Sequence, residues 1–307
     1  MENNIYDLAI LGAGPAGICA AIYATRAKLN TIWLDRKFVQ GGQIVDTYEV
    51  DNYPGLPGIT GLDLGEAMAG HAEKLGLKPK REPVLSVTDE GEIKVIRTKK
   101  NEYHARAVII ACGATHRHLG IPGEEELGGM GVSYCATCDA AFFQEGTVAV
   151  VGGGNVAVED VILLSRTCKK VYLVHRRDEL RAEKILQDSL FDCHNVELVW
   201  DSVPVSVEGE DKVTALKVRN VKTDEEKEIS VDGVFIAVGI VPGSGKFKDL
   251  VKMDESGYII AGEDGVTSTP GIFAAGDIRT KNLRQVVTAV ADGANAVAAV
   301  QRYLMEY

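Results

Sequence analysis

Two cysteines, Cys135 and Cys138, flank two residues in the stretch YCATCD, and Asp139 follows the second cysteine directly. A C-x-x-C pair can ligate zinc, close a small loop as a disulfide, or carry two electrons as a reversible dithiol. The carboxyl group of Asp139 could protonate a departing thiolate by general acid catalysis, but an aspartate here could also cap a helix or lie in a solvated turn. The hexapeptide does not decide between these roles, so the choice depends on the rest of the chain.

A nucleotide-binding pattern lies near the start of the chain. An apolar run at 8–11 predicts a strand buried on both faces, and the turn GAGPAG follows it at 12–17. A helix-like segment then leads to a second apolar strand, 31–34, which ends in the acid Asp35. This order of strand, turn, helix, strand and terminal acid is typical of a dinucleotide-binding βαβ unit.

The residue types of this first pattern each have a physical reason. Gly12 makes the tight turn, Gly14 lets the backbone approach a pyrophosphate, and Gly17 allows close packing of helix and strand. Asp35 can accept a hydrogen bond from a ribose hydroxyl. A terminal acid would repel a 2′-phosphate, so this site suits FAD.

The same plan returns in the second half of the chain. A predicted strand at 147–151 precedes the turn GGGNVA at 152–157, and a helix-like segment leads to another strand at 171–174. Further strand patterns follow in both halves, and each half closes on an apolar strand that ends in glycine. The sequence therefore predicts two similar α/β domains, each built to hold one dinucleotide.

Basic residues replace the terminal acid in the second pattern. His175, Arg176 and Arg177 follow the strand at the place where Asp35 follows its own, and Arg181 comes shortly afterwards. Arginine makes charge-assisted hydrogen bonds to phosphate, each worth roughly 1.5–3 kcal/mol. The alternative is a solvated basic start of a helix. At this position the arginines favour NADPH over NADH.

The composition limits the classes of function. The chain has 307 residues, enough for two domains, with 46% apolar residues and 33 glycines, which suits α/β domains with many tight turns. The net charge of −11 argues against nucleic acid or an anionic membrane as a partner. Six cysteines do not make a secreted disulfide scaffold, and the start MENNIYDLAILGAG resembles neither a signal peptide nor a membrane span. We therefore expect a cytoplasmic protein.

Two dinucleotide sites of different type imply an electron relay. The C-x-x-C pair lies between the two nucleotide patterns in sequence, so it is best interpreted as a third, redox-active station of this relay. Zinc would need four ligands, commonly from a second such pair, and the chain has none. The histidines His116 and His118 fall in a Gly- and Pro-containing segment that is a candidate domain boundary.

Seven motifs extend this interpretation to the whole chain: GAGPAG, GGQ, DNYPG, CATCD, GGGNVAVED, HRRDELRAEK and TSTPGIFAAGD followed by LRQ. With them the chain resembles the low-molecular-weight, bacterial-type thioredoxin reductase family, a class II pyridine nucleotide-disulfide oxidoreductase family. The resemblance implies two Rossmann-like three-layer domains, with the FAD domain discontinuous. The expected division is 1–114 and 245–307 for FAD, and 115–244 for NADPH and the C-x-x-C pair.

The resemblance also assigns cofactor-binding residues. Asp277 would bind the ribityl chain of FAD, and Arg284 and Gln285 would lie beside its isoalloxazine ring. The expected FAD set is Gly12, Gly14, Pro15, Ala16, Gly17, Asp35, Gly42, Gln43, Asn52, Gly113, Asp277, Arg284, Gln285 and Val286. The expected NADPH set is Gly152, Gly154, Asn155, Ala157, His175, Arg176, Arg177 and Arg181.

The mechanism implied by the resemblance uses NADPH, FAD and the dithiol in turn. NADPH reduces the FAD, and the reduced flavin reduces the disulfide of Cys135 and Cys138. Cys138 would face the flavin, Cys135 would attack the disulfide of thioredoxin or a thioredoxin-like protein, and Asp139 would be the acid. Family members are homodimers whose NADPH domain rotates about two connecting strands between the half-reactions. The segments THRHLG and VPGSG are the expected hinge.

The chain departs from the family pattern at two positions. Val156 stands where the family usually has Ser or Thr, and Gly243 where it commonly has Asn. These changes leave open a relative that takes electrons from reduced ferredoxin instead of NADPH. A flavin oxidase, a ferredoxin–NADP reductase on the same fold, and a non-catalytic flavin-binding redox sensor would also retain the FAD motifs. The CATCD motif counts against the oxidase and the ferredoxin–NADP reductase.

Overall fold

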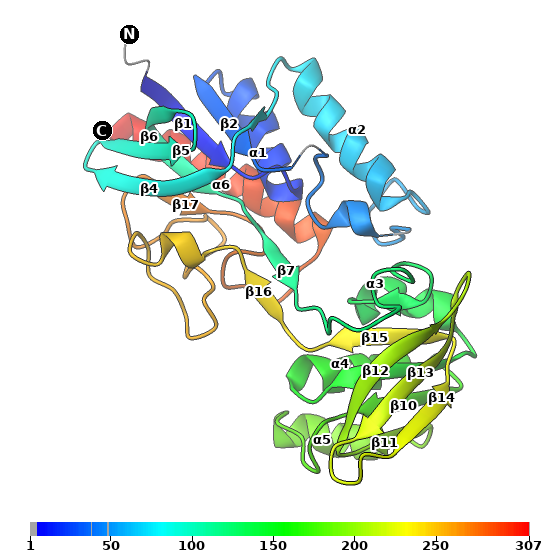
Figure 1. Cartoon of the computed structure of the whole chain (residues 1–307). Coiled ribbons are helices and arrows are strands. Elements are labelled where there is room, and N and C mark those ends of the chain that lie inside the picture. Colours follow the sequence, from blue (N-terminus) through cyan, green and yellow to red (C-terminus); the bar gives the residue numbers. More distant parts are fainter. Residues whose placement is uncertain (1–4, 38, 48, 307) are drawn as a thin grey trace. The chain divides into compact units, whose positions relative to one another are not determined.

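The chain folds into two compact units (Figure 1). The structure is a computed structural model that describes residues 5–37, 39–47 and 49–306. One unit is His116–Ile240, and the other is made of the segments before and after it. The larger unit is therefore discontinuous, with the smaller inserted in it.

Two short strands join the units. The strand β7 (Ala114–His116) leads into the inserted unit, β16 (Ile240–Pro242) leads out of it, and the two pair with each other. The N–H of Gly243 donates to the carbonyl of Gly113 at 2.9 Å. This bond ties the segment after β16 to the discontinuous unit, so the structure divides the chain a few residues before 244, the boundary expected from the sequence.

A seven-stranded sheet forms the centre of the discontinuous unit. Its order is β3-β2-β1-β6-β5-β4, and β17 also pairs with β6. The strands β3, β2, β1, β6 and β17 are parallel, as a βαβ nucleotide-binding unit requires, whereas β4 and β5 add antiparallel pairs. The strands are β1 (Ile5–Leu11), β2 (Thr31–Asp35), β3 (Lys80–Arg81), β4 (Val84–Glu90), β5 (Ile93–Thr98), β6 (Glu102–Ile110) and β17 (Ile272–Ala274).

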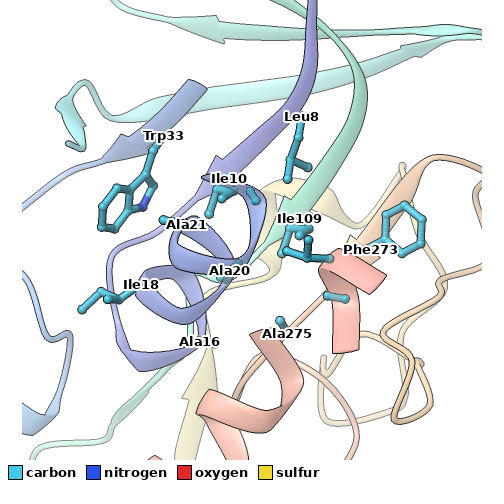
Figure 2. Close-up of a cluster of buried hydrophobic side chains, with 14 of the residues drawn as sticks. Leu8, Ile10, Ala16, Ile18, Ala20, Ala21, Trp33, Ile109, Phe273 and Ala275 are labelled. Carbon is cyan, nitrogen blue, oxygen red and sulfur yellow. The ribbon is translucent and has the colours of Figure 1, made fainter. Parts of the chain in front are cut away.

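Helices pack closely on this sheet. Figure 2 shows part of the core, in which Leu8 and Ile10 of β1 lie near the small residues of α1. A Cβ atom on Gly293 of α6 would lie 2.2 Å from the carbonyl oxygen of Ala16 in α1, so glycine lets the two helices approach this closely. The helices are α1 (Pro15–Arg26), α2 (Gly61–Lys74) and α6 (Val286–Glu306), with short 3₁₀ helices η1 (Ile44–Asp46) and η3 (Gly245–Phe247).

The inserted unit has a five-stranded parallel sheet of order β11-β10-β9-β15-β8. Alternate residues of β9 face opposite layers, because Val150 packs with Val158 of α4 and Val151 packs with Leu216 of β13. An antiparallel sheet, β12-β13-β14, forms the third layer. The elements are β8 (Val132–Ser133), α3 (Ala136–Asp139), η2 (Ala140–Phe143), β9 (Thr147–Gly152), α4 (Asn155–Leu164), β10 (Lys170–Val174), α5 (Lys184–Phe191), β11 (Val196–Val199), β12 (Ser202–Gly209), β13 (Val213–Asn220), β14 (Glu226–Ser230) and β15 (Gly233–Ala237).

These layers confirm the predicted fold class, two Rossmann-like α/β units of which the first is discontinuous. Both nucleotide patterns form a strand, a turn and a helix in the order the sequence predicts. Among the described residues, no helix combines the length and apolarity needed to cross a bilayer.

Candidate functional site

The turn after β1 has a backbone that suits only glycine. Gly12 has φ of +113°, and a Cβ atom on it would lie 2.3 Å from the carbonyl oxygen of Ala111. A Cβ on Gly17 would lie 2.0 Å from the carbonyl oxygen of Gly12. Gly14 is the N-cap of α1 and Pro15 its first residue, and a glycine has no side chain with which to cap the helix. The first-turn N–H groups of α1 can therefore bind an anionic phosphate.

The GGQ segment lies against this turn. Gly42 has φ of +70°, and a Cβ on it would lie 3.0 Å from the Cα of Gly14. Gln43 Nε2 donates a hydrogen bond to the carbonyl of Ala114. Gly113, one residue earlier, has φ of +64°. Three segments of the predicted FAD set therefore meet at the start of α1.

The TSTPGIFAAGD segment reaches the same helix from late in the chain. A Cβ on Gly276 would lie 2.9 Å from the Cβ of Ala16. The next residue, Asp277, has a buried Oδ1 atom that accepts no hydrogen bond from the described residues, and burial raises the pKa of this carboxyl. The buried Nε of Arg284 also has no hydrogen-bond partner among them, and its guanidinium carbon lies 4.1 Å from the centre of the Tyr258 ring.

The remaining predicted FAD residues lie in the same unit. Asn52 Nδ2 donates to Gln285 Oε1 at 3.0 Å. Val286 is the first residue of α6 and packs beside a small hydrophobic cluster. Asp35 ends β2, and burial raises its pKa although the backbone N–H groups of the next two residues stabilise the carboxylate. The fold thus brings together residues that are far apart in sequence.

These features fit FAD. The glycine turn and the N-terminus of α1 suit a pyrophosphate. Buried polar atoms normally have partners, and the unpaired Asp277 Oδ1 and Arg284 Nε would gain them from the hydroxyls and ring atoms of a flavin. The assignment of each residue to a part of FAD stays a prediction.

The second nucleotide turn is equally tight. A Cβ on Gly152 would lie 2.5 Å from the Cβ of Ala157. Gly154 is the N-cap of α4, which has no side-chain cap. The ring of His175 lies over Gly153, where a Cβ would come within 2.2 Å of it. His175 Nε2 is buried without a hydrogen-bond partner among the described residues, and burial lowers the pKa of this imidazole.

The arginines lie beside this turn. The backbone N–H of Arg181 donates to the carbonyl of Gly153 at 2.8 Å, which ties the basic loop to the turn. The side chains of Arg176, Arg177 and Arg181 are exposed, and they make no ion pair with the described carboxylates. The exposed guanidinium groups and the N-terminus of α4 fit the 2′-phosphate and pyrophosphate of NADPH.

Asn155 and Val156 are the first two residues of α4. Val156 is 54% exposed and offers no hydroxyl to a ligand at this helix end. Asn155 exchanges two hydrogen bonds with Glu183, from Nδ2 to Oε1 at 3.1 Å and from the Glu183 N–H to Oδ1 at 2.9 Å. Asn155 therefore fixes the segment that precedes α5, and its predicted contact with NADPH stays a prediction.

The two cysteines form a disulfide at the start of the short helix α3, with their Cα atoms 5.3 Å apart. Cys135 is the N-cap, and the N–H of Cys138 donates to its Sγ at 3.2 Å. Behind the disulfide, Ser133 Oγ donates to Asp139 Oδ2 at 2.5 Å and accepts from the Cys135 N–H at 3.1 Å. The Asp139 side chain does not cap the following helix η2, so the role of a helix cap is removed for this residue.

Burial controls the protonation of Asp139. It raises the pKa of the carboxyl, and the hydrogen bond from Ser133 opposes this shift in part. A carboxyl with a raised pKa keeps its proton to higher pH, which suits a general acid. Ser133 is a functional candidate that sequence reasoning missed, and its only signal was its place two residues before Cys135.

Glu124 fixes the segment in front of the disulfide, and the motifs did not indicate this residue. Tyr134, which precedes Cys135, donates its hydroxyl to Glu124 Oε1 at 2.7 Å. The Glu124 carboxylate also accepts the backbone N–H groups of Leu119 at 3.0 Å and Gly120 at 2.7 Å. A buried carboxylate thus joins the segment after β7 to the start of the dithiol loop.

Comparison with known proteins defines the class. The family model described as pyridine nucleotide-disulphide oxidoreductase matches residues 6–293. The chain belongs to this family, in agreement with its two nucleotide turns and its redox-type disulfide.

Individual relatives define the class more closely. The thioredoxin reductase of Bacillus subtilis (strain 168) is 47% identical over 306 residues, which cover 99% of this chain and 96% of the relative. That of Listeria innocua is 48% identical with the same coverage. The crystal structure of thioredoxin reductase from Streptococcus pyogenes MGAS5005 matches with a TM-score of 0.95 at 45% identity and covers 100% of both chains.

Within the family the chain belongs with the thioredoxin reductases, enzymes that use FAD and NADPH. The predicted enzyme class and cofactors are confirmed. This membership favours a disulfide reductase over the flavin oxidase, the ferredoxin–NADP reductase and the non-catalytic sensor.

Proposed function

We propose that the chain reduces the disulfide of thioredoxin, or of a thioredoxin-like protein, through its own Cys135–Cys138 pair. The observation that carries the proposal is the disulfide at the start of α3 with the carboxyl of Asp139 behind it. The same unit contains the arginine-rich nucleotide turn, and the other unit contains the glycine cradle that fits FAD. When bound, FAD accepts a hydride from NADPH and passes the electron pair to a disulfide.

The discontinuous unit binds and orients the flavin cofactor. When FAD is bound, the N-terminus of α1 would hold its pyrophosphate, and Asp35 would accept a hydrogen bond from a ribose hydroxyl. Asp277 would bind the ribityl chain, and Arg284 and Gln285 would lie beside the ring. The support for these roles is that the segments meet at one place, where Asp277 Oδ1 and Arg284 Nε have no hydrogen-bond partner among the described residues.

The dithiol performs thiol–disulfide exchange. In the reduced pair, the Cys135 thiolate attacks one sulfur of the partner's disulfide, and a mixed disulfide forms as the other partner sulfur leaves. Asp139 gives its proton to this leaving thiolate. The Cys138 thiolate then attacks Cys135 Sγ, which releases the second partner thiolate and restores the Cys135–Cys138 disulfide. Two electrons pass to the partner, and both of its thiolates are protonated: one proton comes from Asp139, and the other is the proton that the Cys138 thiol loses when it becomes a thiolate.

Removal of the Ser133 hydroxyl should change the pH dependence of this exchange. The hydrogen bond from Ser133 lowers the pKa of Asp139, so Ser133→Ala raises that pKa further. The rate of thioredoxin reduction falls as pH rises through the Asp139 pKa, because the acid loses its proton. We therefore expect this falling limb to move to higher pH in Ser133→Ala, measured as single-turnover rates across pH. Ser202→Ala removes another buried hydroxyl of the same unit and should leave the limb in place.

The affinity for NADPH as electron donor depends on the residues at the start of α4. Val156 forgoes a hydrogen bond to phosphate that would contribute roughly 0.5–1.5 kcal/mol, or up to about 3 kcal/mol with a charged acceptor. This corresponds to an affinity loss of about tenfold to somewhat over a hundredfold, which weakens NADPH without abolishing its binding. We expect Val156→Thr to lower the KM for NADPH by about tenfold, because the exposed site can accept a hydroxyl. Val156→Ala is the control and should give no improvement.

Further parts of the proposal concern the assembly and its motion. We propose that the inserted unit rotates about β7 and β16 between the half-reactions, since these two strands connect the units. We also propose a homodimer in the cytoplasm. Light scattering would test the dimer, and a distance measurement between one label in each unit, before and after reduction, would test the rotation.

One anaerobic experiment tests the central proposal. NADPH is added to the FAD-loaded enzyme while the flavin absorbance is followed, and oxidised thioredoxin with a thiol reporter is added next. We expect bleaching of the flavin within minutes, followed by thiol release. If NADPH up to millimolar concentration leaves the flavin oxidised while reduced ferredoxin bleaches it, the donor assignment is wrong. The enzyme would then be a ferredoxin-dependent reductase with a vestigial nucleotide site.

A further inference from the structure

A buried carboxylate organises the loop that carries Asp277. Asp292 of α6 accepts Arg279 Nε at 2.9 Å and Arg279 Nη2 at 2.6 Å, on different oxygens. The same carboxylate accepts Lys281 Nζ and the backbone N–H of Gly276, each at 2.9 Å. Asp292 is 5% exposed and Arg279 is 6% exposed, so these charge-assisted bonds lie away from water.

Lys281 lies within reach of a second carboxylate. Its Nζ is 4.0 Å from Asp277 Oδ1, the buried oxygen without a hydrogen-bond partner among the described residues. The Lys281 side chain is 6% exposed, so its buried ammonium group needs a carboxylate partner. Of the two carboxylates, Asp292 receives the short bond and Asp277 does not.

The four charges of this cluster balance. Arg279 and Lys281 supply two positive charges, and Asp277 and Asp292 supply two negative ones. If Asp292 lost its charge, the ammonium of Lys281 would have Asp277 as its nearest remaining carboxylate. A short ion pair between them would occupy the oxygen that accepts no hydrogen bond from the described residues.

The cluster is also fixed to the helix that begins the FAD turn. Gly293, next to Asp292, is the residue whose Cβ would collide with the Ala16 carbonyl of α1. Gly276, which donates to Asp292, also lies against Ala16. Asp292 therefore sits at the contact of α6 with α1 and holds the Asp277 loop at that contact.

We propose that Asp292 is a positioning residue for FAD: it engages Arg279 and Lys281 so that the Asp277 carboxylate stays available to a hydroxyl of the cofactor. The inference rests on the role of Asp277 in the proposed function and adds the residues that keep it available. It assigns Lys281 as the internal competitor for that carboxylate.

FAD affinity tests the proposal directly. Apo-protein is titrated with FAD, and the dissociation constant is measured by quenching of flavin fluorescence. We expect Asp292→Asn to weaken FAD binding by about tenfold or more, the effect of losing one charge-assisted hydrogen bond. In the double variant Asp292→Asn/Lys281→Met the competitor is gone, and most of the affinity should return. A purely structural role of Asp292 predicts no such recovery, since the second change removes another buried partner.

A second pair of variants tests the proposal even if Asp292→Asn does not fold. Arg279→Met/Asp292→Leu replaces a buried ion pair by apolar groups, a change that proteins often tolerate. This double variant should weaken FAD binding as Asp292→Asn does. The addition of Lys281→Met should restore FAD binding. The proposal is wrong if Lys281→Met restores FAD affinity in neither the Asp292→Asn nor the Arg279→Met/Asp292→Leu background. It is also wrong if Asp292→Asn binds FAD with wild-type affinity. Asp277→Asn distinguishes the underlying assumption: if it binds FAD as the wild type does, the role of Asp277 itself is wrong.

Discussion

Replacement of Cys135 or Cys138 by serine will abolish thioredoxin reduction and leave FAD bound and reducible by NADPH. A serine hydroxyl forms no disulfide, so we expect turnover to fall by at least about a thousandfold in either variant. FAD binding should survive because both cysteines lie in the inserted unit, whereas the FAD cradle lies in the other. The measurements are NADPH-dependent thiol release and the flavin spectrum before and after NADPH.

The two variants should differ in one respect. In Cys138→Ser the attacking Cys135 remains, so reduction stops at a mixed disulfide with thioredoxin that mass spectrometry under non-reducing conditions detects. Cys135→Ser should trap no such species. Cys193→Ser removes a partly buried free thiol of the same unit and serves as the matched control, with wild-type turnover expected. Loss of FAD from either active-site variant, or bound zinc found by metal analysis, would contradict the redox assignment.

Replacement of Arg176 and Arg177 by alanine will raise the KM for NADPH far more than the KM for NADH. Each charge-assisted hydrogen bond to the 2′-phosphate is worth roughly 1.5–3 kcal/mol, so the loss per arginine should be about tenfold or more. NADH has no 2′-phosphate and should bind the variant almost as it binds the wild type. Steady-state kinetics with both nucleotides measure the ratio of the two effects.

A matched control separates this specific effect from a change in surface charge. Arg219 is an exposed arginine on β13 of the same unit, and it pairs loosely with Asp224 at 3.8 Å. Arg219→Ala changes the net charge by the same amount per residue and should leave the ratio of the two KM values unchanged. Equal increases for NADPH and NADH in the Arg176 and Arg177 variant would show that these arginines do not read the 2′-phosphate.

Both nucleotide-binding patterns were predictable because their causes are local. Gly12 follows a buried strand and has a positive φ, and the strict need for glycine there is expressed within a few residues of sequence. The same holds for the ends of two strands: Asp35 ends β2 and His175 follows β10, and these different residue types predict two kinds of nucleotide. Periodicity and turn chemistry act over one βαβ unit, and a single sequence shows them directly.

The hydrogen-bond partners of the carboxylates at these sites were not predictable from local sequence. The hydrogen bond from Ser133 to Asp139 and the bonds from Arg279 and Lys281 to Asp292 follow no residue pattern that marks them in advance. The second boundary of the inserted unit, after Ile240, also differs from the expected 244, because the hydrogen bond from Gly243 to Gly113 ties the segment after β16 to the discontinuous unit. Each of these contacts depends on how separate segments pack.

The residues of this chain thus determined the two dinucleotide units and a dithiol as the redox group, and they predict a preference for a 2′-phosphate in the second unit. Only the tertiary structure decided that Gly276 lies against Ala16, that Asp277 and Arg284 hold buried polar atoms with no hydrogen-bond partner among the described residues, and that Asp139 is half-buried behind the disulfide. The physical reason is the distance along the sequence over which each property is determined. Backbone conformation depends on neighbours along the chain, whereas burial and protonation depend on segments that meet only after folding.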